Sequence, residues 1–231
     1  MSKHGGHIIA SMEEALAYAE GRPSKVRVYR PSPKEIREAR LREITMPIEG
    51  AEEYETMLWI DVESSGLHDG SYPIEIGWCG ASLESTAFLI RPVSSWTAAD
   101  WSPASERMHG ISRQRLVQCG QDPVDVGHWL NAACSGKTVL SDNPSHDARW
   151  LDRLYDDVGI LREFDIQDAV HAAGVAAGLS RISQEEADSI LARIYSKFPH
   201  PHRAGPDSRR SAAAFLAMAM PWQLQEIEGS A

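Results

Sequence analysis

The sequence predicts an α/β domain in which helices flank a mixed central sheet, with three leading strands, later parallel strands and a small N-terminal extension. Three short apolar segments follow one another with turn signals between them, which is typical of consecutive paired strands. A fourth apolar segment then lies between two helical segments, and a strand in that setting commonly joins the same sheet in parallel. Together these patterns indicate a sheet of mixed direction that helices cover.

The predicted strands are short apolar runs, with turn signals at Gly70 and Gly80. They are Met57–Asp61, Ile74–Trp78, Thr86–Ile90 and Thr138–Leu140. The predicted helices carry apolar residues at spacings of three and four, as Trp150 and Leu154 do, and Pro221 stops the last of them. They are Asp125–Ala133, Asp147–Asp156, Gln167–Ala177, Gln184–Lys197 and Asp207–Met220.

Residues 1–54 differ from the rest and are assigned to a basic N-terminal extension, with residues 55–231 forming the main domain. The extension is expected to contain a short amphipathic helix at Ser11–Glu20, a small strand at Val26–Tyr29 and a basic helical stretch at Lys34–Arg42. An exposed arm or docking appendage is the expected role. Binding of nucleic acid or of a protein partner is the alternative.

The overall charge limits the kinds of partner. The net charge is −10, with an isoelectric point near 5.4. Because neutralisation of phosphates dominates affinity for duplex DNA, this charge argues against a broad basic surface that tracks long duplexes. It is compatible with short or single strands, which need few phosphate contacts.

No feature of the sequence indicates a membrane or an oxidising compartment. No run of about 18 apolar residues occurs, so no membrane span is predicted. Residues 1–6 lack the apolar run of a signal peptide. The three cysteines, Cys79, Cys119 and Cys134, are widely spaced and odd in number. A cytoplasmic protein with reduced thiols is therefore expected.

Asp61 and Glu63 form the first acidic motif, at the end of the first predicted strand. Because strand side chains alternate, residues two apart lie on the same face of the sheet. Two carboxylates on a covered face are costly unless cations pair with them. An Asp-x-Glu pair alone is common by chance, but here an apolar run precedes it and Ser64-Ser65-Gly66-Leu67 follows it directly.

The second acidic motif is Asn143-x-x-x-Asp147, which follows the strand predicted at Thr138–Leu140. Asp147 begins the helix predicted at Asp147–Asp156. Asp142 precedes that helix and is the less favoured of the two as a possible metal ligand. His146, directly before Asp147, has three roles open to it, namely helix cap, phosphate contact and surface residue, of which the last is favoured.

The third motif is His202-x-Ala204-x-x-Asp207, ahead of the alanine-rich last helix. Pro206 suits the first turn of that helix, where a backbone N–H would be unpaired in any case. The prolines and glycine around His202 predict that it lies on a loop. His200 lies nearby but lacks this spacing from an acid.

The three motifs, in this order and at these separations, resemble the DEDDh branch of the DnaQ-like and RNase T-like 3′-5′ exonucleases, in the ribonuclease H-like superfamily. A fourth segment, Trp101–Ser112, resembles the family's stretch that contains His-Gly-Ile and borders the terminal nucleotide. His146 departs from the family pattern, in which Phe usually stands before the Asp. The resemblance covers roughly residues 55–222.

The resemblance implies a ribonuclease H-like fold and a metal-dependent exonuclease. Such an enzyme releases nucleoside 5′-monophosphates from the 3′ ends of single-stranded or 3′-overhanging DNA or RNA. It implies two ions held by four carboxylates, those of Asp61, Glu63, Asp147 and Asp207. Oxygen ligands without thiolates indicate Mg²⁺ or Mn²⁺ rather than zinc. His202 would act as general base on a metal-bound water.

The same resemblance places substrate-binding groups beside the acids. Backbone groups near Ser64 and Ser65 would bind the terminal 3′-OH, and Leu67 and His109 would flank the last base.

Three alternatives remain open. The chain could be a nucleic-acid-binding regulatory module with little turnover, an oligoribonuclease-like hydrolase of very short oligonucleotides, or a hydrolase of small phosphodiesters. The preference for DNA or RNA depends on the shape of the pocket. Homodimers are frequent in the family, and the N-terminal extension is the expected contact for any protein partner.

Overall fold

The computed structural model describes residues 54–231. The helix, strand and basic stretch expected within residues 11–42 lie outside the described residues. Among residues 54–231, no helix combines the length and apolar character needed to cross a membrane. All three cysteines are free thiols.

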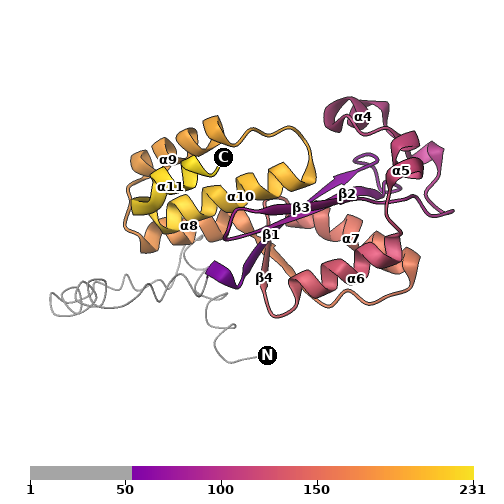
Figure 1. Ribbon diagram of the computed structural model, residues 1–231, viewed down its shortest axis with the longest axis horizontal. Helices are drawn as coiled ribbons and strands as arrows, with labels where there is room; N and C mark the ends of the chain where they lie inside the picture. Colours follow the sequence, from indigo (N-terminus) through magenta and orange to yellow (C-terminus); the bar gives the residue numbers. More distant parts are fainter. Residues whose placement is uncertain (1–53) are drawn as a thin grey trace, which may run out of the picture. The chain divides into compact units, whose positions relative to one another are not determined.

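A five-stranded mixed sheet forms the centre of the described domain, in the order β3-β2-β1-β4-β5 (Figure 1). β1, β2 and β3 form antiparallel pairs, whereas β4 pairs parallel with β1 and β5 parallel with β4. The predicted mixed sheet is therefore confirmed. The strands are β1 (Met57–Ser64), β2 (Pro73–Gly80), β3 (Ser85–Leu89), β4 (Thr138–Ser141) and β5 (Ile166–Asp168).

Eight α-helices surround this sheet in the described part of the chain. They are α4 (Pro103–His109), α5 (Arg113–Cys119), α6 (Pro123–Cys134), α7 (Pro144–Val158), α8 (Ala169–Leu179), α9 (Gln184–Lys197), α10 (Ala204–Ala219) and α11 (Leu224–Gly229). The sequence prediction lacks α4, α5 and α11, because helices of six or seven residues are too short to show a helical period. Two short 3₁₀ turns lie at Ala98–Asp100 and Pro221–Gln223.

The helix predicted at Gln167–Ala177 begins later than expected. Residues 166–168 form β5, which pairs with β4. α8 then begins at Ala169, because the side chain of Asp168 accepts a hydrogen bond from the His171 N–H at 2.9 Å and so caps the helix.

The last helix begins earlier than predicted, at Ala204 rather than Asp207. The Ala204 N–H, which no turn of the helix can satisfy, donates to the carboxylate of Glu75 on β2 at 2.9 Å. Pro206 lies in the first turn of α10, as predicted, and Ala204 and Gly205 belong to the same turn.

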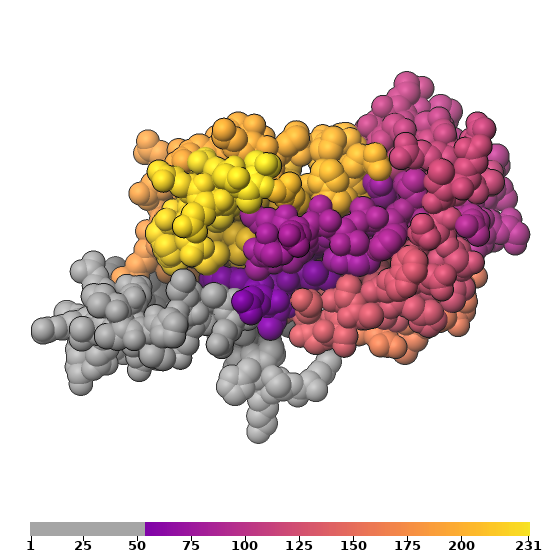
Figure 2. All heavy atoms as spheres, viewed as in Figure 1, coloured from indigo at the N-terminus to yellow at the C-terminus, as the bar shows by residue number. Residues whose placement is uncertain are grey.

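Helices cover both faces of the sheet (Figure 1). α10 packs over β1, β2 and β3, and α8, α9 and α11 pack around α10. On the other face, α7 packs against β1 and β2, and α6 packs on α7. Figure 2 shows the C-terminal helices, in yellow, packed against the first strands, in indigo and purple.

The alternation of β1 assigns its side chains to these two layers. Leu58, Ile60 and Val62 belong to the core cluster that includes α6 and α7. Trp59 belongs to the cluster that includes α8, α9 and α10. Since Asp61 and Glu63 have the same parity as Trp59, their carboxylates face the α10 side of the sheet.

Helix α10 approaches β2 unusually closely at Gly77. A β carbon on Gly77 would lie 2.4 Å from the backbone carbonyl carbon of Ala204. Gly205 is also close to the sheet, because its β carbon would lie 3.2 Å from that of Ala87 on β3. The first turn of α10 can therefore sit on the sheet only because residue 77 has no side chain.

We expect Gly77→Ala to lower the free energy of unfolding by at least about 1–3 kcal/mol, because the new methyl group collides with backbone that cannot move independently of α10. Chemical denaturation monitored by circular dichroism measures the change. Gly80→Ala is the matched control on the same strand, since its β carbon would meet nothing within 4 Å. Equal stability of the two variants would contradict this account of the packing.

Candidate metal centre

The structure brings the three acidic motifs together at the ends of β1 and β4 and the starts of α7 and α10. Carboxylate oxygens of Asp61, Glu63 and Asp207 all lie within 4.8 Å of one another. Asp147 lies close enough to raise the pKa of Asp61, and its effect is the largest that any neighbouring charge has there. The four predicted ligands therefore occupy one site.

Asp147 is positioned by β4 and the first turn of α7. The Ser141 hydroxyl, at the end of β4, donates to its Oδ2 at 2.5 Å. The same hydroxyl oxygen accepts from the Asn143 N–H at 2.9 Å. Asp142 is exposed, yet its charge raises the pKa of Asp61, Glu63 and Asp147.

His146 does not enter the acid cluster directly. Its Nδ1 lies 2.9 Å from the side-chain oxygen of Asn143, which precedes α7. Its ring also contacts that of Trp150, with the ring centroids 5.6 Å apart. Both contacts are local to the start of α7, and the His146 side chain is partly exposed.

Burial and mutual repulsion make this site a poor place for free carboxylates. Burial, followed by repulsion from neighbouring acids, raises the pKa of Asp61 well above its ordinary value and that of Glu63 to about 7. Burial likewise raises the pKa of Asp147 to about 8 against the opposing hydrogen bond from Ser141. Burial also raises the pKa of Asp207. Near neutral pH the cluster therefore holds protons unless cations replace them.

Two of these carboxylate oxygens lack the partners that buried polar atoms usually have. Asp61 Oδ2 and Asp207 Oδ1 are buried and accept no hydrogen bond. Hard divalent cations bind such oxygens, and positive charge would relieve the repulsion among the acids. The residues present therefore fit the cation site that the sequence predicts.

His202 lies on the loop between α9 and α10, as predicted, with a left-handed backbone φ of +55°. His200, which lacks the motif's spacing from Asp207, also lies at the site. Its Nε2 lies 3.3 Å from Asp207 Oδ2, and the two imidazole rings lie 4.4 Å apart. Spacing is an insufficient criterion here, because this segment is an irregular loop in which residues two apart can face the same group.

A partly buried ion pair, which is not predicted from the sequence, lies beside the acids. Glu75 on β2 is buried, and its carboxylate accepts hydrogen bonds from the Nε and Nη2 of Arg203. Glu75 raises the pKa of Glu63, whereas Arg203 lowers it. The only sequence signal for this pair is a glutamate within the otherwise apolar β2, because its partner lies 128 residues away.

The predicted substrate-binding residues surround the turn after β1. The Ser65 N–H donates to the Tyr72 carbonyl at 2.9 Å, and the Ser65 carbonyl accepts from the Ser102 N–H at 2.7 Å. The Ser64 hydroxyl donates to the Gly66 carbonyl at 2.8 Å. These hydrogen bonds stabilise the turn after β1, so both serines have a structural role that does not depend on a substrate.

Leu67 and His109 differ strongly in exposure. The Leu67 side chain is 70% exposed, which makes it available to a ligand. His109 is buried; its Nδ1 accepts from the Ile111 N–H at 3.0 Å, and its ring also interacts with the backbone of Ser64. Burial lowers the pKa of His109. Their contact with a terminal nucleotide stays a prediction.

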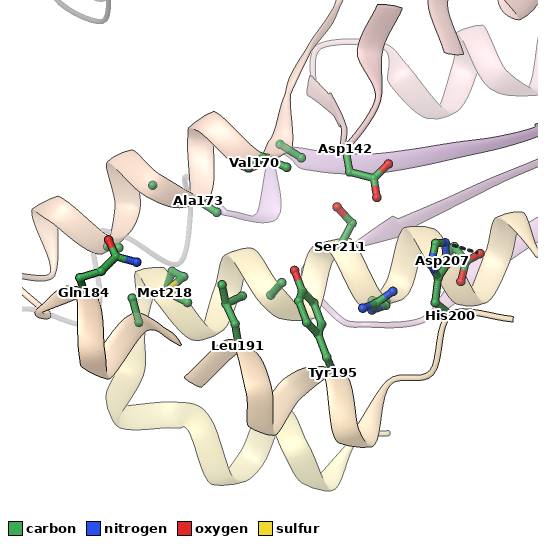
Figure 3. Close-up of a pocket in the computed structure, with 16 residues that line it drawn as sticks. Asp142, Val170, Ala173, Gln184, Leu191, Tyr195, His200, Asp207, Ser211 and Met218 are labelled. Carbon is green, nitrogen blue, oxygen red and sulfur yellow. Dashed lines mark ion pairs between the residues drawn. The ribbon is translucent and has the colours of Figure 1, made fainter. Parts of the chain in front are cut away.

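A groove of about 440 Å³ leads away from the acids between α8, α9 and α10 (Figure 3). Asp142, His200 and Asp207 line one end of it. Small and apolar side chains line most of its length, and Tyr195 and Arg210 are among the lining residues. The guanidinium carbon of Arg210 lies 4.0 Å from the centroid of the Tyr195 ring, so an aromatic face and a cation occur together.

No protein-family model and no curated protein sequence matches this chain. Solved structures do. A structure of exonuclease I, described as suggesting how processivity is achieved, matches with a TM-score of 0.53 and 14% identity over 74% of this chain. Escherichia coli exonuclease I in complex with a dT13 oligonucleotide matches with a TM-score of 0.52. The same enzyme in complex with a dA16 oligonucleotide matches with a TM-score of 0.51. Both matches have 14% identity and cover 74% of this chain.

These comparisons establish the fold. The chain has the ribonuclease H-like fold that exonuclease I shares, which confirms the predicted fold class. The match covers only 42% of the length of each of these exonuclease I chains. The similarity therefore concerns the domain and not the complete enzyme.

Asp147 provides a test of the electrostatics. Its pKa is about 8 in the folded protein and about 3.8 when unfolded, so the folded state binds the extra proton between these values. Its contribution to stability is thus complete below about pH 4 and is lost as the pH rises to about 8. In a chelator, we expect the stability of the wild type to fall relative to Asp147→Asn across this range.

Denaturation of both proteins at about pH 5 and about pH 8 measures this difference. Mg²⁺ or Mn²⁺ should stabilise the wild type at the higher pH and have much less effect on Asp147→Asn. If the free energy of unfolding changed with pH in the same way for both proteins, the pKa of Asp147 would not be raised in the metal-free state.

Proposed function

We propose that this chain is a metal-dependent 3′-5′ exonuclease acting on single-stranded or 3′-overhanging nucleic acid. One observation carries the proposal: acids from three distant segments meet in a buried cluster that raises their pKa values and leaves two oxygens unpartnered. A folded protein tolerates such repulsion where cations bind. Exonuclease I, on the same fold, is crystallised with single-stranded oligonucleotides, which supports this class of substrate.

In this proposal Asp61, Glu63, Asp147 and Asp207 hold two Mg²⁺ or Mn²⁺ ions. When bound, such ions stabilise the attacking and leaving oxygens of a phosphodiester displacement. The protein supplies fixed geometry: Ser141 orients Asp147, and the N–H of Arg203 donates to Asp207 Oδ2 at 3.0 Å.

His202 is proposed as the general base that takes the proton of the attacking water. One ring nitrogen of His202 lies within 4.8 Å of a carboxylate oxygen of Asp207 and of a ring nitrogen of His200, which supports this role. A positioned base of this kind contributes about 10²–10⁴-fold to the rate.

The substrate strand is proposed to cross the acids between two surfaces. The terminal nucleotide lies on the side of Leu67 and His109, with its 3′-OH near the backbone of Ser64 and Ser65. The preceding nucleotides lie in the groove of Figure 3, where the Tyr195 and Arg210 pair offers stacking and positive charge. An apolar groove with few cations suits a short single strand and agrees with the net charge of −10.

We expect a 5′-labelled single-stranded oligonucleotide to yield a ladder that shortens one nucleotide at a time when Mg²⁺ or Mn²⁺ is added. Asp61→Asn should remove this activity, since it deletes a charge at the centre of the cluster. Matched DNA and RNA strands of several lengths, separated on a denaturing gel, make the measurement.

The outcomes separate the candidate functions. Binding without shortening would identify a regulatory module, and cleavage limited to dinucleotides would identify a hydrolase of very short oligonucleotides. Internal cuts would contradict the exonuclease proposal. A strand that ends in a 3′-phosphate serves as control, because recognition of a free 3′-OH predicts that it resists cleavage.

We expect His202→Ala to lower kcat by about 10²–10⁴-fold while leaving stabilisation by Mg²⁺ or Mn²⁺ largely intact, because the residue moves a proton and does not hold these ions. Single-turnover kinetics and thermal denaturation with metal give the two readouts. The matched control is His128→Ala, which removes an exposed histidine on α6. An unchanged rate in His202→Ala would exclude it as the base.

A further inference from the structure

We propose that His200, His202 and Asp207 form a second cation site, specific for a transition metal such as Zn²⁺, that shares only Asp207 with the oxygen cluster. One ligand atom from each of these three residues lies within 4.8 Å of the other two. Two imidazoles and one carboxylate are a donor set suited to zinc and unsuited to Mg²⁺. None of the roles proposed above for the oxygen cluster requires His200.

The distances fit the geometry of zinc. His200 Nε2 and Asp207 Oδ2 lie 3.3 Å apart, as the dashed line in Figure 3 marks. In a tetrahedral site with bonds of about 2.0–2.1 Å, two ligand atoms lie about 3.3–3.4 Å apart. This edge of the tetrahedron is therefore already formed, and a ring nitrogen of His202 lies within 4.8 Å of both residues.

The surroundings permit the entry of an ion. The His200 side chain is 44% exposed, so the site opens to solvent. His202 lies on the loop before α10, whereas Asp207 lies within the first turn of that helix and is buried. A fixed carboxylate and two imidazoles on an adjacent loop allow the loop to close on the metal, with water completing the coordination.

The site would regulate the proposed exonuclease, and this consequence rests on that proposed function. A nitrogen that binds Zn²⁺ has no free lone pair with which to accept a proton. Zinc at this site would therefore remove His202 from its role as base while the oxygen cluster keeps its Mg²⁺ or Mn²⁺. The identity of the available metal would then decide whether hydrolysis proceeds.

Calorimetric titration with Zn²⁺ in the presence of saturating Mg²⁺ tests the site directly. We expect the wild type to bind one equivalent that Mg²⁺ does not displace, and His200→Ala to bind it at least about 100-fold more weakly. Loss of an outer hydrogen-bond partner costs about 10–100-fold, so loss of a ligand should cost no less. His128→Ala should bind Zn²⁺ as the wild type does. Co²⁺ in place of Zn²⁺ should give the visible absorption of a tetrahedral site.

A second measurement tests the regulation. Zn²⁺ added to a reaction supported by Mn²⁺ should inhibit the wild type, and His200→Ala should need at least about 100-fold more Zn²⁺ for the same inhibition. Wild-type Zn²⁺ affinity in His200→Ala, or full displacement of Zn²⁺ by Mg²⁺, would overturn the proposed site. Absence of hydrolysis with every metal would refute the exonuclease proposal alone, because the titration does not depend on it.

Discussion

The close contact between the first turn of α10 and strand β2 is the constraint on which the rest of the site depends. Gly77 lets the two backbones meet, and Glu75 binds both the guanidinium of Arg203 and the N–H of Ala204. This partly buried ion pair and the hydrogen bond from Ala204 join the start of the helix to β2. Asp207, one turn further on, is thereby held against Asp61 and Glu63, which reach the same face by the alternation of β1.

The buried acids in this region differ in whether a positively charged side chain pairs with them. The buried carboxylate of Glu75 accepts hydrogen bonds from the guanidinium of Arg203 and from the N–H of Ala204. Within residues 54–231 no such cation pairs with Asp61 or Asp147, and burial raises the pKa of both. Glu75, which is paired with Arg203, lies close to the acid cluster. The acids of the cluster lack an equivalent partner among the described residues. Ionisation of these buried carboxylates brings repulsion that bound cations would relieve, which is the physical basis of the proposed site.

The sequence predicts most of this fold because its elements have strong local patterns. The β strands β1 to β4 are apolar runs, and α9 has the predicted bounds, with a capping box at Ser183 and Glu186. By contrast, β5 has three residues and merges with the start of α8. The resemblance of the motifs to the exonuclease family likewise predicts that Asp61, Glu63, Asp147 and Asp207 are neighbours. It does not reveal Glu75 with Arg203, or the contact of His200 with Asp207, because these depend on how distant segments and an irregular loop lie in space.

Asp207 belongs to two donor sets that differ in rigidity as well as in chemistry. The oxygen set comes from β1, α7 and α10, which the core holds in place, so it can select an ion by charge without changing shape. The nitrogen set includes an exposed histidine and one with a left-handed backbone, both on a loop, so its geometry can follow the ion that enters. A hard cation therefore gains most from the rigid cluster and a borderline cation from the loop. Since both sets need the same carboxylate, occupation of one site must alter the affinity of the other, and by linkage the effect is reciprocal.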